Sequence, residues 1–404
     1  MAALTPGAFA RRLSLRLRWV NEDLAEVEWQ DEHNNDWNYR VRCGPLLSLA
    51  GEMRRKLDML LQAFMNEPDG DKPRQALRGL FELGHDLFGA LFASVDGDDE
   101  TARAARTLYE RCDAQGDLAL QLKVAPRLTL PWGLVVPTLD GADEASRDAT
   151  APNRLFWALR HDLSVATFGA HGDWRNALCG ADVRVVAAVH RRIFESAQRS
   201  RITAFEVRLI EVLTERAYNG MLFDVAGLSG ALRDTGRDAQ AQLRVAYLLG
   251  HGNGQRFQLS DTDEISASSL VQRIQSTAER TQRLPTLLFL NGCQTAADAP
   301  DFRFADLLDY RSVCAFIGTE VRVPDLFAVR YSLALLHAVL VQGRNLREAV
   351  SALGRDHLPL SLAYSLYATD SLVIEPCADG LLDLLPPEAR PCGNLSMGPV
   401  KCAA

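Results

Sequence analysis

From residue 182 onward the chain alternates strand-like and helix-like segments, and this alternation is the strongest constraint on its fold. Residues 183–189 (VRVVAAV) form an unbroken apolar run, which is typical of a strand covered on both faces. Further strand-like runs lie at 222–228, 244–250, 286–292, 313–319 and 364–374. Helical segments are expected at 203–217, 267–282, 325–342 and 345–354. We therefore expect an α/β fold with a mostly parallel central sheet.

The first 180 residues follow a different pattern. Apolar and polar residues alternate over 13–41, as they do in a hairpin or meander of half-buried strands. Amphipathic helices are expected at 46–64, 74–93 and 101–112, and residues 138–153 have the polar, aperiodic composition of a long exposed loop. We predict an N-terminal α+β region over residues 1–180, packed on a core over residues 181–404.

Charge and cysteine content narrow the range of functions. The 404 residues carry 44 basic and 52 acidic side chains, a net charge of −8, without a basic stripe, so no nucleic-acid contact is expected. No apolar run approaches the roughly 18 residues of a membrane span, and arginines interrupt the segment that a signal peptide needs to keep apolar. We expect a cytoplasmic protein that does not bind membranes. The eight cysteines lack zinc-type spacing, so we expect no metal and no other cofactor.

Two of the strand-like runs end in reactive side chains. His251 follows the run at 244–250, in AYLLGHGNG, and Cys293 follows the run at 286–292, in LLFLNGCQTA. Functional groups gather at the carboxyl ends of parallel strands, and the 42 residues between the two (293 − 251 = 42) leave room for one helical crossover. If the two strands are neighbours, the imidazole and the thiol come close together, as a thiolate nucleophile and its base require.

Other interpretations of these residues remain open at this point. A single cysteine at a strand end is usually a small buried residue, and a single His-Gly is usually a turn. An unrelated α/β enzyme is disfavoured, because neither G-x-S-x-G nor G-x-G-x-x-G follows a strand. The glycine-rich GHGNG lacks the Lys-Ser/Thr of a phosphate-binding loop.

These segments resemble the CHAT family of caspase-like cysteine peptidases, in the clan that includes caspases, separase, legumain and gingipains. YLLGHGNG is similar to the family's apolar strand ending in His-Gly, and LLFLNGCQTA to its strand ending in a small residue, Cys and a polar residue. LTLPWGLVV resembles the family's Leu-Pro-Trp-Glu segment, with Gly133 in place of Glu. The family's third hallmark matches at Gly318, Thr319, Val323, Pro324, Asp325, Gly343, Leu346 and Ala349. The resemblance covers about residues 80–375.

The resemblance implies a caspase-like three-layer sandwich and a role for each site residue. His251 would be the general base and Cys293 the nucleophile, with the backbone N–H groups of Gly252 and Cys293 forming the oxyanion hole. His190 would contact the substrate, or is simply a loop histidine, and candidates for the pocket that binds the substrate residue before the scissile bond (P1) are Arg191, Asn291, Glu320 and Asp325. An acidic lining would favour Lys or Arg at P1 and a basic lining Asp. Glu320 and Asp325 can equally be solvated, and Asp325 can equally be the N-cap of the following helix.

The resemblance also implies a biological setting. It suggests a bacterial cysteine endopeptidase that cleaves one specific partner protein, such as a gasdermin-like pore former or another effector of defence or cell death. The substrate would be encoded nearby, and a separate activator or sensor can be expected. The alternative is a catalytically inactive caspase-like scaffold that only binds proteins.

Overall fold

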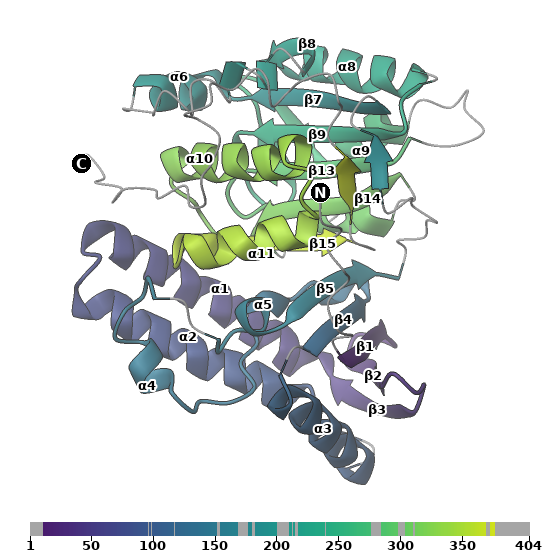
Figure 1. Cartoon of the computed structure of the whole chain (residues 1–404), viewed down its shortest axis with the longest axis vertical. Coiled ribbons are helices and arrows are strands. Elements are labelled where there is room, and N and C mark those ends of the chain that lie inside the picture. Colours follow the sequence, from purple (N-terminus) through teal and green to yellow (C-terminus); the bar gives the residue numbers. More distant parts are fainter. Residues whose placement is uncertain are drawn as a thin grey trace, which may run out of the picture.

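The computed structural model describes residues 11–375 apart from short gaps. The gaps lie at 96, 98, 117, 152–153, 169–176, 180–181, 200–209, 212, 215–216, 239, 276–283, 298–303, 310–311 and 369–371. Two sheets with their own helices form two parts of the molecule (Figure 1). The N-terminal part is in the lower half of that view and the core is in the upper half, with helix α11 at the boundary.

The N-terminal part contains a five-stranded sheet in the order β3-β2-β1-β4-β5. Its strands are β1 (Arg11–Trp19), β2 (Leu24–Gln30), β3 (Asp36–Arg42), β4 (Leu118–Val124) and β5 (Asp162–Thr167). β1, β2 and β3 form the expected antiparallel meander, while β4 and β5 run parallel to β1. Buried residues alternate along β1, β2 and β4, as expected of a sheet with one face on a core.

Three helices follow the meander: α1 (Cys43–Asn66), α2 (Asp71–Ala90) and α3 (Asp99–Ala114). The short elements α4 (Ala142–Ala145) and α5 (Trp157–Arg160) and the 3₁₀ turns η1 (Pro126–Leu128) and η2 (Trp132–Leu134) complete this part. The predicted loop at 138–153 therefore contains the short helix α4.

The core contains a six-stranded sheet in the order β15-β14-β13-β9-β7-β8. Its strands are β7 (Val183–Val189), β8 (Ala217–Leu222), β9 (Leu243–Leu249), β13 (Thr286–Asn291), β14 (Val313–Thr319) and β15 (Tyr364–Ala368). All pairs are parallel except β14–β15. Every residue of β9, β13 and β14 is buried, so both faces of the sheet are covered. The predicted α/β fold with a mostly parallel sheet is confirmed.

Helices cover the two faces of this sheet. They are α6 (Arg191–Arg199), α8 (Val225–Arg237), α9 (Ala267–Gln275), α10 (Asp325–Leu336) and α11 (Leu346–Asp356). On β9, Arg244 Nε donates to Thr235 of α8 at 3.0 Å, and the Tyr247 hydroxyl lies 2.7 Å from that of Ser332 in α10. Residues three apart on a strand point to opposite faces, so α8 and α10 lie on opposite sides of the sheet.

The remaining elements are small. A three-stranded sheet follows β9 and is made of β10 (His251–Gly252), β11 (Arg256–Gln258) and β12 (Glu264–Ser266). β6 (Ala177–Cys179) pairs with β16 (Val373–Glu375). Single turns η4 (Phe304–Asp309) and η6 (Leu360–Ala363) and a π-helical turn η5 (His337–Val341) flank the core helices.

One predicted strand is wrong and another element lies outside the described residues. The run at 222–228 is the junction between β8 and α8, because Asp224 is the N-cap of α8 and its carboxylate accepts a hydrogen bond from the N–H of Gly227 at 2.6 Å. A short apolar run does not distinguish a strand from the start of a buried helix. Most of the helix predicted at 203–217 lies outside the described residues, as does the tail after 375.

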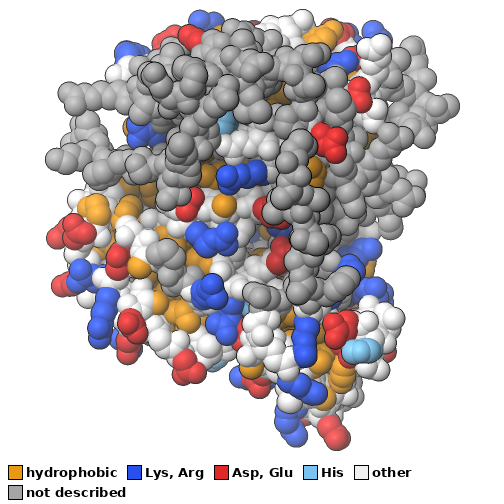
Figure 2. Space-filling view, viewed as in Figure 1, with side chains coloured by type: hydrophobic (Ala, Val, Ile, Leu, Met, Phe, Trp, Pro, Cys, Tyr) orange, Lys and Arg blue, Asp and Glu red, His pale blue; other side chains and the backbone are white. Residues whose placement is uncertain are grey.

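In the part of the chain described above, every helix is too short or too polar to span a bilayer. Basic and acidic side chains are mixed over the described part of the face that Figure 2 shows.

Candidate active site

The ends of β9 and β13 bring His251 and Cys293 to the same edge of the core sheet. The two strands are parallel neighbours, as predicted, and Leu249 is paired with Asn291. His251 and Cys293 each lie two residues beyond that pair, so they are at the same level of the sheet. Just past the strands, the N–H of Gly250 donates to the carbonyl oxygen of Asn291 at 3.2 Å.

Glycines allow the two chains to stay this close after the strands end. A Cβ on Gly292 would lie 2.8 Å from the carbonyl oxygen of Gly250 and 2.6 Å from the Phe257 ring, closer than real Cβ contacts. A Cβ on Gly252 would lie 3.5 Å from the carbonyl oxygen of Cys293. The backbones of the two residues proposed for the oxyanion hole are therefore adjacent.

The Cys293 thiol is free, half-buried and close to the loop that leads into α10. Burial is the main reason why its pKa is raised, and the carboxylates of Asp325 and Asp58 raise it further. A hydrogen bond from the backbone N–H of Val323 and the charge of Arg322 act in the opposite direction. Because the net shift disfavours the thiolate, this thiol needs a base to act as a nucleophile.

His251 is exposed and packs on a second histidine. The rings of His190 and His251 meet edge to face, with their centroids 4.9 Å apart. His190 follows β7, its N–H donates to the carbonyl oxygen of Leu249 at 2.6 Å, and its side chain is 2% exposed. Neither of its ring nitrogens has a hydrogen-bond partner among the described residues, and burial, then the neighbouring His251, lowers its pKa. The buried His190 ring therefore packs against one side of the exposed His251 imidazole, with Asp261 3.9 Å from Nε2 of His190.

No hydrogen bond joins the His251 imidazole to the Cys293 thiol in the described structure. Catalytic hydrogen bonds are often long in proteins without substrate and shorten only in the substrate complex.

The P1-pocket candidates form two groups: exposed residues near the strand ends, and residues whose polar groups are bonded inside the protein. Asp325 is exposed at the start of α10 and is close enough to raise the pKa values of both Cys293 and His190. Pro324 is the N-cap of α10 and Asp325 its first helical residue, so the capping alternative for Asp325 does not hold. Arg191 lies in α6, with its guanidinium 4.5 Å from the centroid of the Phe223 ring.

The polar groups of Asn291 and Glu320 are used inside the protein. The Asn291 amide donates to the carbonyl oxygen of Ala328 at 2.6 Å and accepts from the Tyr364 hydroxyl at 2.8 Å. The Glu320 side chain is 1% exposed and pairs with Arg54 of α1, at 2.8 Å from Oε2 to Nε. The structure therefore brings together His190, His251, Cys293 and Asp325, but directs Glu320 toward the N-terminal part.

Sequence reasoning missed the contribution of α1 to this site. Asp58 and Arg54 are one helical turn apart in α1, and the first acts electrostatically on Cys293 while the second pairs with Glu320. Their distance along the chain from Cys293 leaves no sequence signal for this proximity. No group of three or more His, Cys, Asp and Glu side chains suited to a metal ion occurs among the described residues.

The fold and this edge of the sheet define an α/β protein with a histidine and a cysteine at neighbouring strand ends. No family model matches the sequence, and no curated protein matches it. Solved structures that match include two crystal structures of the Saccharomyces cerevisiae separase–securin complex. Both matches have 11% sequence identity and a TM-score of 0.46, and they cover 90% and 91% of this chain. The chain spans 30% of the length of those chains.

Proposed function

We propose that this protein is a cysteine endopeptidase in which Cys293 is the nucleophile and His251 the general base. The observation that carries the proposal is the register of β9 and β13, which places both residues two positions beyond a paired Leu249 and Asn291. The edge-to-face contact with His190 supports it, because an oriented imidazole is what a base needs.

The proposed reaction is acyl transfer in two steps. His251 takes the thiol proton as the Cys293 sulfur attacks the scissile carbonyl carbon, and the resulting oxyanion accepts hydrogen bonds from the N–H groups of Gly252 and Cys293. The imidazolium then protonates the leaving amine as the C–N bond breaks, and the acyl group stays on Cys293 as a thioester. Water, deprotonated by His251, hydrolyses the thioester and restores the thiol.

The charges around Cys293 support a basic residue at P1. The carboxylates of Asp325 in the core and Asp58 in α1 both act electrostatically on the thiol, against the single cation of Arg322. A Lys or Arg side chain would bring a cation to these two carboxylates. The resemblance to the CHAT family extends the proposal to the substrate, which would be one specific partner protein, encoded nearby and active in defence or cell death. A separate protein would activate the peptidase.

The experiment is co-expression of the chain with the product of each neighbouring gene, followed by intact mass spectrometry. We expect a new fragment with the wild type, none with Cys293→Ala, and an unchanged fragment with Cys112→Ala. Cys112 is a matched control, because it is also a partly buried free thiol whose pKa is raised by burial. A fragment that persists with Cys293→Ala would contradict the proposal.

A protein-binding scaffold is the second candidate, favoured by the raised pKa of the Cys293 thiol, which disfavours the thiolate. The scaffold hypothesis predicts a stable complex between this protein and the product of a neighbouring gene. The complex should still form with Cys293→Ala, and the partner should never be cleaved.

A further inference from the structure

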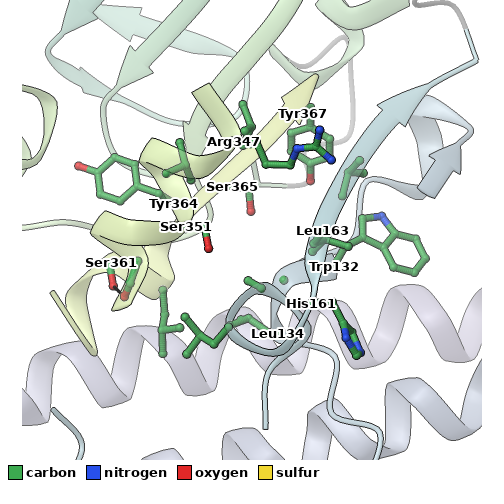
Figure 3. A pocket seen from close by; sticks show the side chains of 18 of the residues that line it. Trp132, Leu134, His161, Leu163, Arg347, Ser351, Ser361, Tyr364, Ser365 and Tyr367 are labelled. Carbon is green, nitrogen blue, oxygen red and sulfur yellow. Dashed lines mark hydrogen bonds between the residues drawn. The ribbon is translucent and has the colours of Figure 1, made fainter. Parts of the chain in front are cut away.

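A cavity of about 100 Å³ lies between the two parts of the molecule (Figure 3). Its walls come from β15, η6 and α11 of the core, and from η2, α5 and β5 of the N-terminal part. None of the four residues gathered at the candidate active site lines it. It is therefore a separate site.

The interior of the cavity offers mainly apolar surface. Leucine, valine and aromatic side chains dominate the lining. Several polar groups there are already used: the Tyr367 hydroxyl donates to the carbonyl oxygen of Leu130 at 3.2 Å, and the Ser361 hydroxyl to that of Gly354 at 2.7 Å. Apolar cavities bind apolar molecules, and one of about 150 Å³ accepts benzene. This cavity is smaller, so the body of a ligand here is limited to a few carbon atoms.

Arg347 supplies the one cation of the lining. It reaches the cavity from α11, on the upper side of the view in Figure 3. Its side chain is 21% exposed, and its single charged partner among the described residues is Asp162, at 3.4 Å from Nη1 to Oδ1. A guanidinium has five N–H donors in a planar fork, so most of these donors are left for a ligand. The planar fork matches a carboxylate with two parallel hydrogen bonds.

We propose that this cavity binds a small monocarboxylate with an aliphatic body of about three or four carbon atoms. The body fills the apolar interior, and the carboxylate pairs with Arg347. A single negative charge fits better than a dianion, because Asp162 is half-exposed beside the same guanidinium. Small ligand sites are commonly built in this way, with apolar walls and one polar group that fixes orientation.

The occupant would touch side chains that reach toward the strand ends of the active site. Tyr364 and Ser365 line the cavity, and their hydroxyls donate to Asn291 at 2.8 Å and to Glu320 at 2.6 Å. Binding itself does not depend on the peptidase proposal, and it can be measured without any substrate.

The test is isothermal titration of the full chain with butyrate, and with butyramide as its neutral counterpart. We expect saturable binding of butyrate and weaker binding of the amide. Arg347→Gln should weaken butyrate binding by about tenfold or more, since it removes a charge-assisted pair. Val350→Phe places a ring in the lining and should abolish binding of both probes. Arg237→Gln, an exposed arginine of α8, is the matched control and should change nothing.

Val350→Phe decides the question if Arg347→Gln does not fold. The proposal is overturned if butyrate shows no saturable binding at millimolar concentration, or if the amide binds as tightly. It is also overturned if binding survives Val350→Phe.

Discussion

Breaking the ion pair between Arg54 and Glu320 by removing one partner should cost the folded state several kcal/mol. It joins α1 to the residue after β14, and the side chains are 11% and 1% exposed. Ser365 donates a further hydrogen bond to Glu320 at 2.6 Å, and Arg54 donates to the carbonyl oxygen of Thr129 at 3.0 Å. Arg54→Met removes the cation but keeps the apolar stem, so the Glu320 carboxylate is left buried without a counter-charge. Removing one partner of such a pair costs about 3–5 kcal/mol.

Urea unfolding measured by circular dichroism tests this value through the free energy of unfolding. Arg55→Met is the matched control, because Arg55 is the exposed neighbour in α1, 4.0 Å from Glu52, and should cost less than about 1 kcal/mol. In the double variant, Glu320→Gln removes the stranded charge while its amide oxygen still accepts from Ser365. The double variant should therefore be no less stable than Arg54→Met alone. A loss below about 1 kcal/mol for Arg54→Met would refute the reasoning.

Three further predictions concern the thiol, a buried histidine and a glycine. The Asp325 carboxylate raises the pKa of Cys293, so Asp325→Asn should lower the pH midpoint for alkylation of that thiol by iodoacetamide. An unchanged or higher midpoint would contradict this prediction. Burial lowers the pKa of His337 from 6.5 to about 4, so the unfolded chain binds a proton that the folded chain does not. Stability should therefore fall by on the order of 3 kcal/mol between pH 6.5 and 4, and thermal unfolding of His337→Leu should show a smaller fall. An equal fall in the variant would exclude this histidine as a cause. Gly292→Ala should lower the free energy of unfolding by about 1–3 kcal/mol through overpacking and should suppress activity. Gly89→Ala is the control and should do neither, because nothing lies within 4 Å of its new Cβ. Equal effects of the two variants in urea unfolding would contradict the close approach of Gly292 to Gly250 and Phe257.

Local patterns in the sequence predicted most of the core. The apolar runs at 244–250 and 286–292 correspond to β9 and β13, and their pairing follows from one crossover between parallel neighbours. The run at 222–228 failed because the side chain of Asp224 starts a helix there. A difference of a few residues in where an element begins cannot be read from hydrophobicity alone.

Interactions between the two parts of the molecule could not be predicted. Glu320 was expected at the substrate pocket, yet it pairs with Arg54, 266 residues earlier in the chain. Nothing in the local pattern of either residue specifies the other, because such pairs depend on how the parts dock. The packing of His190 on His251 lies within the core and was not predicted either, because the pattern of a single strand does not show which strand is its neighbour.

The central claim is that Cys293 is a nucleophile activated by His251. The most direct measurement is reaction of the purified chain with a peptidyl acyloxymethyl ketone that carries Arg at P1, followed by peptide mapping of the adduct. We predict an adduct on Cys293 alone among the eight cysteines, formed much more slowly in His251→Ala, and at an unchanged rate in Cys112→Ala. An adduct spread over several cysteines, or one on Cys293 whose rate is the same without His251, would contradict the account.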